Sequence, residues 1–202
     1  MHQLFGNRMY NLLNNFYWRF VRFISTALEI LNCSMRGISL GKKCSFYGLV
    51  KFTKGSKSTI SIGDNCTFRS MSTSNLIGVD RPCIISAIGT GYSCVTIGNC
   101  CGFSGTVIGC FNTITIGNNV RCGANTLITD SDWHEDDPRV GNAKPVIIKD
   151  NVWLGIGVIV MKGVTIGENT IIGAGSVVVK SIPANVIAAG NPCKVIRSLE
   201  HI

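Results

Sequence analysis

The sequence has little charge and few prolines or histidines, and these shortages limit what the chain can be. Charged residues make up 15% of its 202 residues and hydrophobic residues 46%. The low hydrophobicity and high charge of disordered proteins are therefore absent, and the length suits one domain of roughly 100 to 200 residues with an appendage. With 23 glycines and five prolines, the chain also lacks the strict glycine period of collagen.

Paired cysteines are absent too, although the chain has ten cysteines. No two of them lie three residues apart, which excludes the C-x-x-C pairs of zinc sites and redox dithiols. The first residues lack the continuous apolar core and the cleavage site of a secretory signal. We therefore expect reduced thiols in a cytoplasmic protein, with a place at the inner face of the membrane left open.

Basic residues outnumber acidic ones by 19 to 11, which gives a formal net charge of +8. They are scattered along the chain, and no nucleic-acid-binding motif accompanies them. The expected polyanion is therefore a phosphorylated cofactor or an anionic membrane, and nucleic acid is not an expected partner.

The segment 1–36 is expected to form an amphipathic helix from Gln3 to about Asn32. Its apolar residues recur every three or four positions, with polar residues on the opposite face. It is too polar to span a bilayer, which needs about 20 mostly apolar residues in a row. Either the helix packs on its own domain or a partner subunit, or it lies on a membrane. Peripheral membrane contact is favoured by arginines beside an aromatic face, which holds Tyr10, Phe16, Tyr17, Trp18, Phe20 and Phe23.

A six-residue repeat follows and predicts the fold of segment 37–183. Six consecutive hexads have aliphatic first positions, at Ile148, Leu154, Val160, Ile166, Ile172 and Val178. The phrase Ile-Gly returns at spacings near multiples of eighteen residues, which is three hexads per coil. Stacked coils bury one continuous aliphatic column that a single strand could not bury alone. We therefore predict an all-β fold, a parallel β-helix of triangular section, and a short tail over 184–202.

The same register places four cysteines in the core. Cys44, Cys66 and Cys101 fall on fifth positions and Cys122 on a first position. A small buried hydrophobe suits these places, so a structural role is expected for all four.

The register breaks between Ile128 and Ile148, where an insertion over 134–147 is expected. A long polar loop on a regular solenoid is usually functional. His134 opens this loop, and neighbouring carboxylates can favour its protonated form and fix its tautomer, which suits a general base. The alternative is an ordinary solvent-exposed histidine. Asp130 and Asp132 are candidates for substrate contact, and no metal is expected because the spacing matches no metal-binding loop.

Several phrases make the chain resemble the hexapeptide-repeat acyltransferases over roughly Cys94 to Arg197. They include NVWLG from Asn151, GVTIG from Gly163 and IGAGSVV from Ile172. The resemblance is to the sugar O-acetyltransferase branch, which includes galactoside and maltose acetyltransferases and enzymes that acetylate surface polysaccharides.

This resemblance implies a left-handed β-helix, a homotrimer with sites in the clefts between subunits, acetyl-CoA as co-substrate, and His134 as general base. Ser104 takes the place of an asparagine common in galactoside acetyltransferases, which argues against a free galactoside as acceptor. The N-terminal helix favours a surface polysaccharide or its lipid-linked precursor. The cofactor-binding residues that the resemblance implies are Ser104, Trp153, Gly155, Ile156, Ala174, Val179, Lys180, Lys194 and Arg197.

The expected reaction is direct transfer of an acetyl group to a sugar hydroxyl, with backbone amides near Gly155 and Ile156 as candidates for holding the developing oxyanion. A xenobiotic or the amino group of a nucleotide sugar is the alternative acceptor. A purely structural solenoid is the non-enzymatic alternative. A β-helical carbonic anhydrase is excluded because its zinc site needs three histidines and the repeat region contains only His134.

Overall fold

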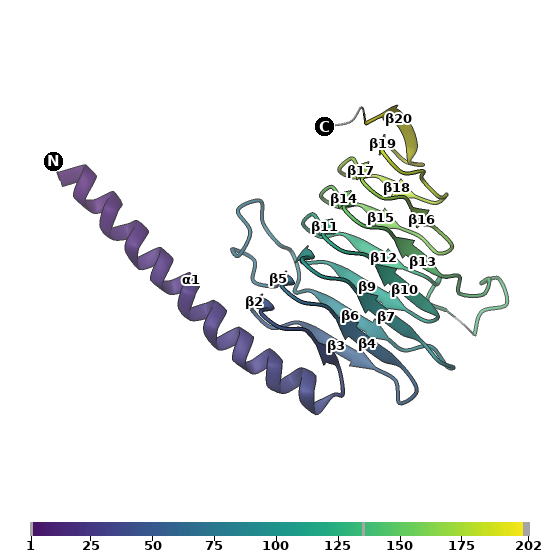
Figure 1. Ribbon diagram of the computed structural model, residues 1–202, viewed down its shortest axis with the longest axis horizontal. Helices are drawn as coiled ribbons and strands as arrows, with labels where there is room; N and C mark the ends of the chain where they lie inside the picture. Colours follow the sequence, from purple (N-terminus) through teal and green to yellow (C-terminus); the bar gives the residue numbers. More distant parts are fainter. Residues whose placement is uncertain (1, 135, 200–202) are drawn as a thin grey trace.

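The computed structural model describes residues 2–134 and 136–199, and for residues 2–8 only the course of the backbone. One long helix, α1 (His2–Met35), precedes three parallel sheets that form the sides of a triangular coil (Figure 1). The first sheet contains β1 (Ser39–Leu40), β4 (Thr59–Ile62), β7 (Cys94–Ile97), β10 (Thr113–Ile116), β13 (Val146–Ile148) and β16 (Thr165–Ile166).

The second sheet contains β2 (Ser45–Tyr47), β5 (Thr67–Arg69), β8 (Gly102–Ser104), β11 (Arg121–Cys122), β14 (Trp153–Leu154), β17 (Ile171–Ile172), β19 (Val186–Ala189) and β20 (Lys194–Ser198). The third contains β3 (Lys51–Lys54), β6 (Ile84–Ala87), β9 (Val107–Cys110), β12 (Leu127–Thr129), β15 (Ile159–Val160) and β18 (Val177–Val178). From β1 to β18 the chain visits the sheets in turn, so each coil has one strand in each sheet, and the predicted parallel β-helix is confirmed.

The predicted aliphatic column forms the core. All six first positions from Ile148 to Val178 are at most 1% exposed. The four cysteines assigned to the core are at most 7% exposed, which confirms their structural role. In the first coils the column is aromatic, because the rings of Phe46, Phe68 and Phe103 stack with centroids 4.9 and 5.0 Å apart.

Asparagines make the corners between the first and second sheets. Asn119, Asn151, Asn169 and Asn185 have φ between 54° and 59°, a left-handed conformation that asparagine tolerates better than most residues. Each of the first three donates a side-chain hydrogen bond to the next, over 2.9, 3.0 and 2.9 Å. Cys100 holds the same conformation at φ 60° without being asparagine.

Helix α1 covers the open end of the β-helix with its polar face. The side chains of Thr26, Ser25 and Glu29 accept hydrogen bonds from alternate backbone amides of the first coil, those of Phe46, Gly48 and Val50, at 3.1, 3.1 and 2.6 Å. Amides of this edge would otherwise be free to pair with another chain. The helix therefore caps the solenoid and takes the place of a coil below the first one.

The other end is closed by the segment predicted as a tail. β19 continues the second sheet in parallel beyond residue 183, and β20 folds back on it as an antiparallel strand. The predicted insertion is present, but it leaves the coil four residues earlier than expected, because β12 ends at Thr129 and β13 begins at Val146.

Candidate functional site

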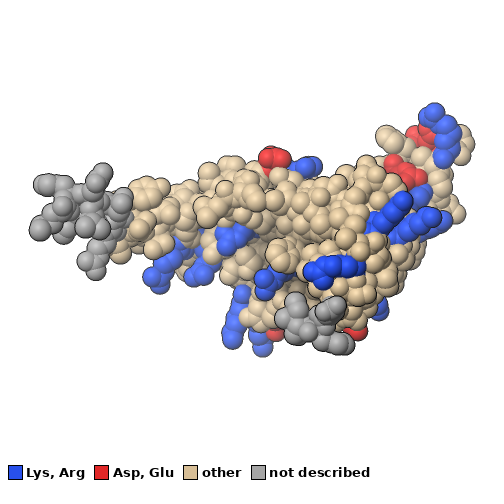
Figure 2. All heavy atoms as spheres, turned by 90° about the horizontal axis from the view of Figure 1, so that it is seen from above, with Lys and Arg blue, Asp and Glu red and all other residues tan. Residues whose placement is uncertain are grey.

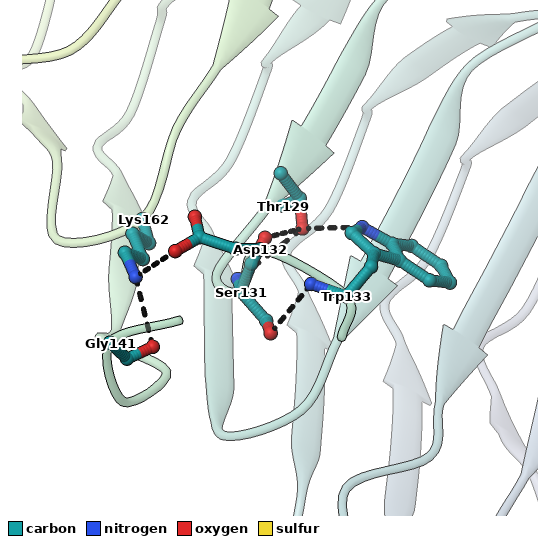
Figure 3. A network of polar contacts seen from close by, with 6 residues as sticks. All are labelled: Thr129, Ser131, Asp132, Trp133, Gly141 and Lys162. Carbon is teal, nitrogen blue, oxygen red and sulfur yellow. Dashed lines mark hydrogen bonds and ion pairs between the residues drawn. The ribbon is translucent and has the colours of Figure 1, made fainter. Parts of the chain in front are cut away.

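The loop that carries His134 is fixed at its base by a tryptophan. Trp133 has φ 73°, and its indole Nε1 donates to Thr129 Oγ1 at 3.0 Å (Figure 3). Its ring meets that of Phe111 edge-on, with the centroids 5.2 Å apart. The indole lies against Gly109 of β9 with no space for a Cβ there. His134 follows directly and is exposed, so its imidazole is presented to solvent beside a rigid anchor.

A lysine joins the two arms of this loop. Lys162 forms an ion pair with Asp132 and donates to the carbonyl of Gly141 at 2.9 Å (Figure 3). The first arm of the loop is stabilised by a local hydrogen bond, in which the hydroxyl of Thr129 donates to the carbonyl of Ser131 at 3.0 Å. Asp132 therefore stabilises the loop, while about a third of its side chain stays exposed.

Asp130 is fully buried, and the expectation that it contacts a substrate is wrong. Its carboxylate accepts hydrogen bonds from the amides of Phe111 and Asn112 at 2.7 and 2.8 Å, and from the thiol of Cys110. Burial, followed by the charge of Asp130, raises the pKa of the Cys110 thiol and keeps it a donor. Asp130 thus ties the loop to the coil below it.

Four predicted cofactor residues line one cavity of about 450 Å³ on the second sheet. They are Trp153, Gly155, Ile156 and Ala174, and the cavity continues along Gly123 and Gly173. Trp153 and Ile156 are 54% and 38% exposed, unlike the aliphatic residues beside them in sequence. An open apolar groove of this kind suits the flexible arm of a cofactor better than it suits packing.

Two residues that line the same cavity have backbone amides without an acceptor in the described part of the chain. Among the described residues, none accepts a hydrogen bond from the amide of Ile156 or of Ala174, whereas the flanking amides of Gly155 and Gly157 bond to neighbouring coils. The amide of Gly155 donates to the carbonyl of Ile172 at 2.8 Å, so it is not the free oxyanion donor that the sequence suggested. The residues present therefore fit a ligand with carbonyl groups, held through Ile156 and Ala174.

The remaining predicted cofactor residues lie at other places. Val179 and Lys180 follow β18 of the third sheet, and both are exposed. Lys194 and Arg197 are exposed on β20, opposite Ala189 and Ile187 of β19. Ser104 is 7% exposed and accepts a hydrogen bond from Asn75 at 3.0 Å.

The predicted site residues thus fall into two groups on different sides of the triangle. His134 follows β12 of the third sheet, and Trp153 opens β14 of the second sheet. The loop after β12 has its own cavity of about 490 Å³, lined by Ser131 and Asp136 among others, which shares no lining residue with the cavity at Trp153. One chain does not bring its candidate base and its candidate cofactor groove together.

A second loop, 70–83, was not foreseen. It leaves the coil between β5 and β6, and its Asn75 and Ile77 line the cavity at Trp153. Its far end is held to the corner of a later coil, where Asn125 donates to Asp80 at 2.9 Å. The sequence carries a signal for it. The buried residues Phe68 and Ile85 are seventeen positions apart, whereas the equivalent buried residues of the neighbouring coils are five or six positions apart.

Two further observations concern metals and membranes. Within residues 9–134 and 136–199, whose side chains the structure describes, no three His, Cys, Asp or Glu side chains come together as a metal site would require. In the same part of the chain, no helix has the length and hydropathy to cross a bilayer.

Part of the repeat matches a known protein family. The family profile for the bacterial transferase hexapeptide, in six repeats, matches residues 145–180, which include the cavity's Trp153 and Ala174. Galactoside O-acetyltransferase of Escherichia coli K12 is 44% identical over 91 residues, which cover 43% of this chain and 45% of that protein. The chain therefore spans less than half the length of this curated relative.

Solved structures agree on the fold. A hexapeptide-repeat acetyltransferase of Vibrio cholerae O1 biovar eltor, complexed with acetyl coenzyme A, matches with a TM-score of 0.54 and 22% identity, covering 87% of this chain and 79% of that one. An N-acyltransferase of Bacillus cereus in complex with dTDP and 3-hydroxybutyryl-CoA matches with a TM-score of 0.63 and 22% identity, covering 84% and 87%. The resemblance to hexapeptide-repeat acyltransferases and the left-handed parallel β-helix are confirmed.

Proposed function

We propose that the protein is an acetyl-CoA-dependent O-acetyltransferase that acts on a sugar hydroxyl. The observation that carries the proposal is the cavity at Trp153, with the free amides of Ile156 and Ala174 beside it, on coils that match the transferase hexapeptide. The 44% identity to a galactoside O-acetyltransferase supports acetyl as the group transferred and a sugar as its acceptor. Its acceptor is proposed to be a surface polysaccharide or the lipid-linked precursor of one.

The proposed site lies between copies in a homotrimer. The separation of His134 from the cavity supports this arrangement, because a neighbouring copy has to supply the missing half. Loop contacts of Trp133 and Lys162 hold the histidine outward, towards such a neighbour.

The proposed chemistry uses residues of both copies that form the site. Bound acetyl-CoA would supply the acetyl group as a thioester, and the amides of Ile156 and Ala174 would hold carbonyl groups of the cofactor. Lys180, Lys194 and Arg197 would neutralise its phosphates. His134 accepts the proton of the sugar hydroxyl as its oxygen bonds to the acetyl carbon, and returns that proton to the departing thiolate. General-base help of this kind contributes typically about 10² to 10⁴ in rate.

The test is a transfer assay with labelled acetyl-CoA. The full chain is incubated with free saccharides, lipid-linked saccharides and an amino-sugar nucleotide, and His134→Ala is compared with Arg139→Ala, an exposed change in the same loop. We expect transfer to a saccharide hydroxyl, a loss of roughly 10² or more for His134→Ala with acetyl-CoA binding intact, and little change for Arg139→Ala. Transfer to the amino sugar alone would show that the acceptor is an amino group and not a hydroxyl. Absence of acetyl-CoA binding would overturn the proposal.

The location is proposed to be cytoplasmic, at the inner face of the membrane, with α1 as the contact. A lipid-linked acceptor would be presented at that surface.

A further inference from the structure

Helix α1 is oriented opposite to an ordinary amphipathic surface helix. Such a helix buries its apolar face on its own domain, but α1 contacts the solenoid through Ser25, Thr26 and Glu29. Trp18 lies on the same side of the helix, with its ring centroid 6.1 Å from that of Tyr47. Its apolar face points away from the β-helix. The large apolar side chains at least 49% exposed along it include Met9, Tyr10, Leu12, Leu13, Phe16, Phe20, Phe23, Leu28, Ile30, Leu31 and Met35.

This apolar face is long. At 1.5 Å per residue, the part of α1 from Met9 to Met35 extends about 40 Å. In Figure 1 the helix runs parallel to the coils and reaches well beyond them. The described part of α1 shows mostly uncharged atoms in Figure 2, and the blue side chains of basic residues lie along one edge of this end of the molecule.

The net charge of the protein is concentrated at the same end. Residues 1–62 contain nine of the nineteen Lys and Arg residues and one of the eleven Asp and Glu residues, the buried Glu29. These residues alone carry the formal net charge of +8, and the rest of the chain is neutral. The cations with exposed side chains are Arg19, Arg22, Arg36, Lys42, Lys43, Lys51 and Lys57.

We infer that α1 lies in the interface of an anionic lipid bilayer, with its apolar face in the acyl region and the basic first coil against the headgroups. Apolar burial and attraction to anionic lipid are the two contributions that hold such helices on membranes. A second copy stacked end to end on this face would also cover apolar surface, but it would press two ends of charge +8 directly against each other. Charge complementarity therefore selects the lipid surface.

This inference deepens the proposed membrane contact by fixing the orientation of the molecule. Because the apolar face is opposite the capping face, the β-helix stands upright on the membrane. The cavity at Trp153 lies four strands above β2 in the second sheet, about 19 Å at the usual spacing of strands. The acceptor sugar of a lipid-linked saccharide would therefore lie several units from its lipid anchor.

The test uses the full chain and two matched double variants. Phe16→Glu with Phe20→Glu adds two charges to the apolar face, and Asn11→Glu with Asn15→Glu adds the same charges at the same spacing on the polar side of the helix. All four side chains are exposed, and circular dichroism establishes that both variants fold. Binding is measured by co-sedimentation with phosphatidylcholine vesicles, with and without phosphatidylglycerol.

We expect the unchanged chain to sediment with the phosphatidylglycerol vesicles, and added salt to weaken that binding. The phenylalanine variant should bind at least about tenfold more weakly than the asparagine variant. Equal losses in both variants, no binding by the unchanged chain, or a lipid-free change of oligomeric state in the phenylalanine variant would each overturn the inference. The assay needs no acetyl transfer, so its failure is separate from failure of the proposed activity.

Discussion

The indole of Trp133 lies against Gly109, and a side chain at position 109 would overlap it. This pair joins the loop of the candidate base to the β-helix. Trp133 holds a left-handed φ of 73°, which bulky residues adopt only where their surroundings enforce it. The position of His134 therefore depends on a glycine in another coil.

Gly109→Ala should displace the indole and with it the loop. We expect the free energy of unfolding to fall by about 1–3 kcal/mol, as overpacked sites do, and the turnover of acetyl transfer to fall while the KM for acetyl-CoA changes little. Chemical denaturation and steady-state kinetics measure these effects. Adding Trp133→Leu should remove most of this loss of stability. If the losses of the two single variants simply add in the double variant, the overlap between residue 109 and the indole is not the cause.

Removal of the capping carboxylate should weaken the end of the solenoid. Glu29→Ala leaves the amide of Val50 buried without its acceptor, so the free energy of unfolding should fall by about 1–3 kcal/mol. Glu29→Gln keeps an acceptor oxygen and should cost less. Denaturant titration of the two variants compares them, and equal stability of Glu29→Ala and the unchanged chain would contradict the capping role.

Cys100 offers a stabilising substitution. It occupies the left-handed corner position that asparagine fills at Asn65 and Asn119. Cys100→Asn should therefore raise the free energy of unfolding by about 0.5–1 kcal/mol, and Cys100→Val should lower it because a β-branched residue resists this conformation. The denaturation midpoints give the order, and a valine variant as stable as the asparagine variant would refute the reasoning.

The alkaline limit of stability should depend on a buried thiol. Burial raises the pKa of Cys33 from its ordinary value of 9.0 to about 12. Below pH 9 the thiol is neutral in both the folded and unfolded states, whereas between pH 9 and about 12 only the unfolded chain loses the proton, so stability falls as pH rises. Thermal denaturation across this range should show a smaller loss of stability for Cys33→Ala than for the unchanged chain. Identical slopes in the two proteins would exclude Cys33 as a contributor.

Much of the fold was predictable because its period is short. Six hexads from Ile148 identify the buried column directly, and the same register identifies Cys44 and Cys66 as core residues. The loop at His134 was predictable for the same reason, as a break in that register. The second loop was missed because the repeat is irregular near Phe68, so a further interruption did not stand out.

The roles of single polar residues could not be predicted in this way. Asp130 and Asp132 look alike in sequence, yet one is buried under the amides of Phe111 and Asn112 and the other pairs with Lys162. These partners lie 18 to 30 residues away in the chain, so only the folded structure shows them. The direction in which the apolar face of α1 points could not be predicted either. The periodicity of a helix identifies its apolar and polar faces, but not what each face contacts.

Co-expression of two inactive variants tests most directly that His134 of one copy serves the cavity of another. His134→Ala removes the candidate base, and Ala174→Glu fills the exposed wall of the cavity in a chain with an intact loop. Each variant alone should transfer acetyl at the background rate. Randomly mixed trimers should recover about a quarter of the unchanged activity, because that share of sites pairs an intact histidine with an intact cavity across subunits. A mixture that stays at the background rate would contradict a site built from two copies.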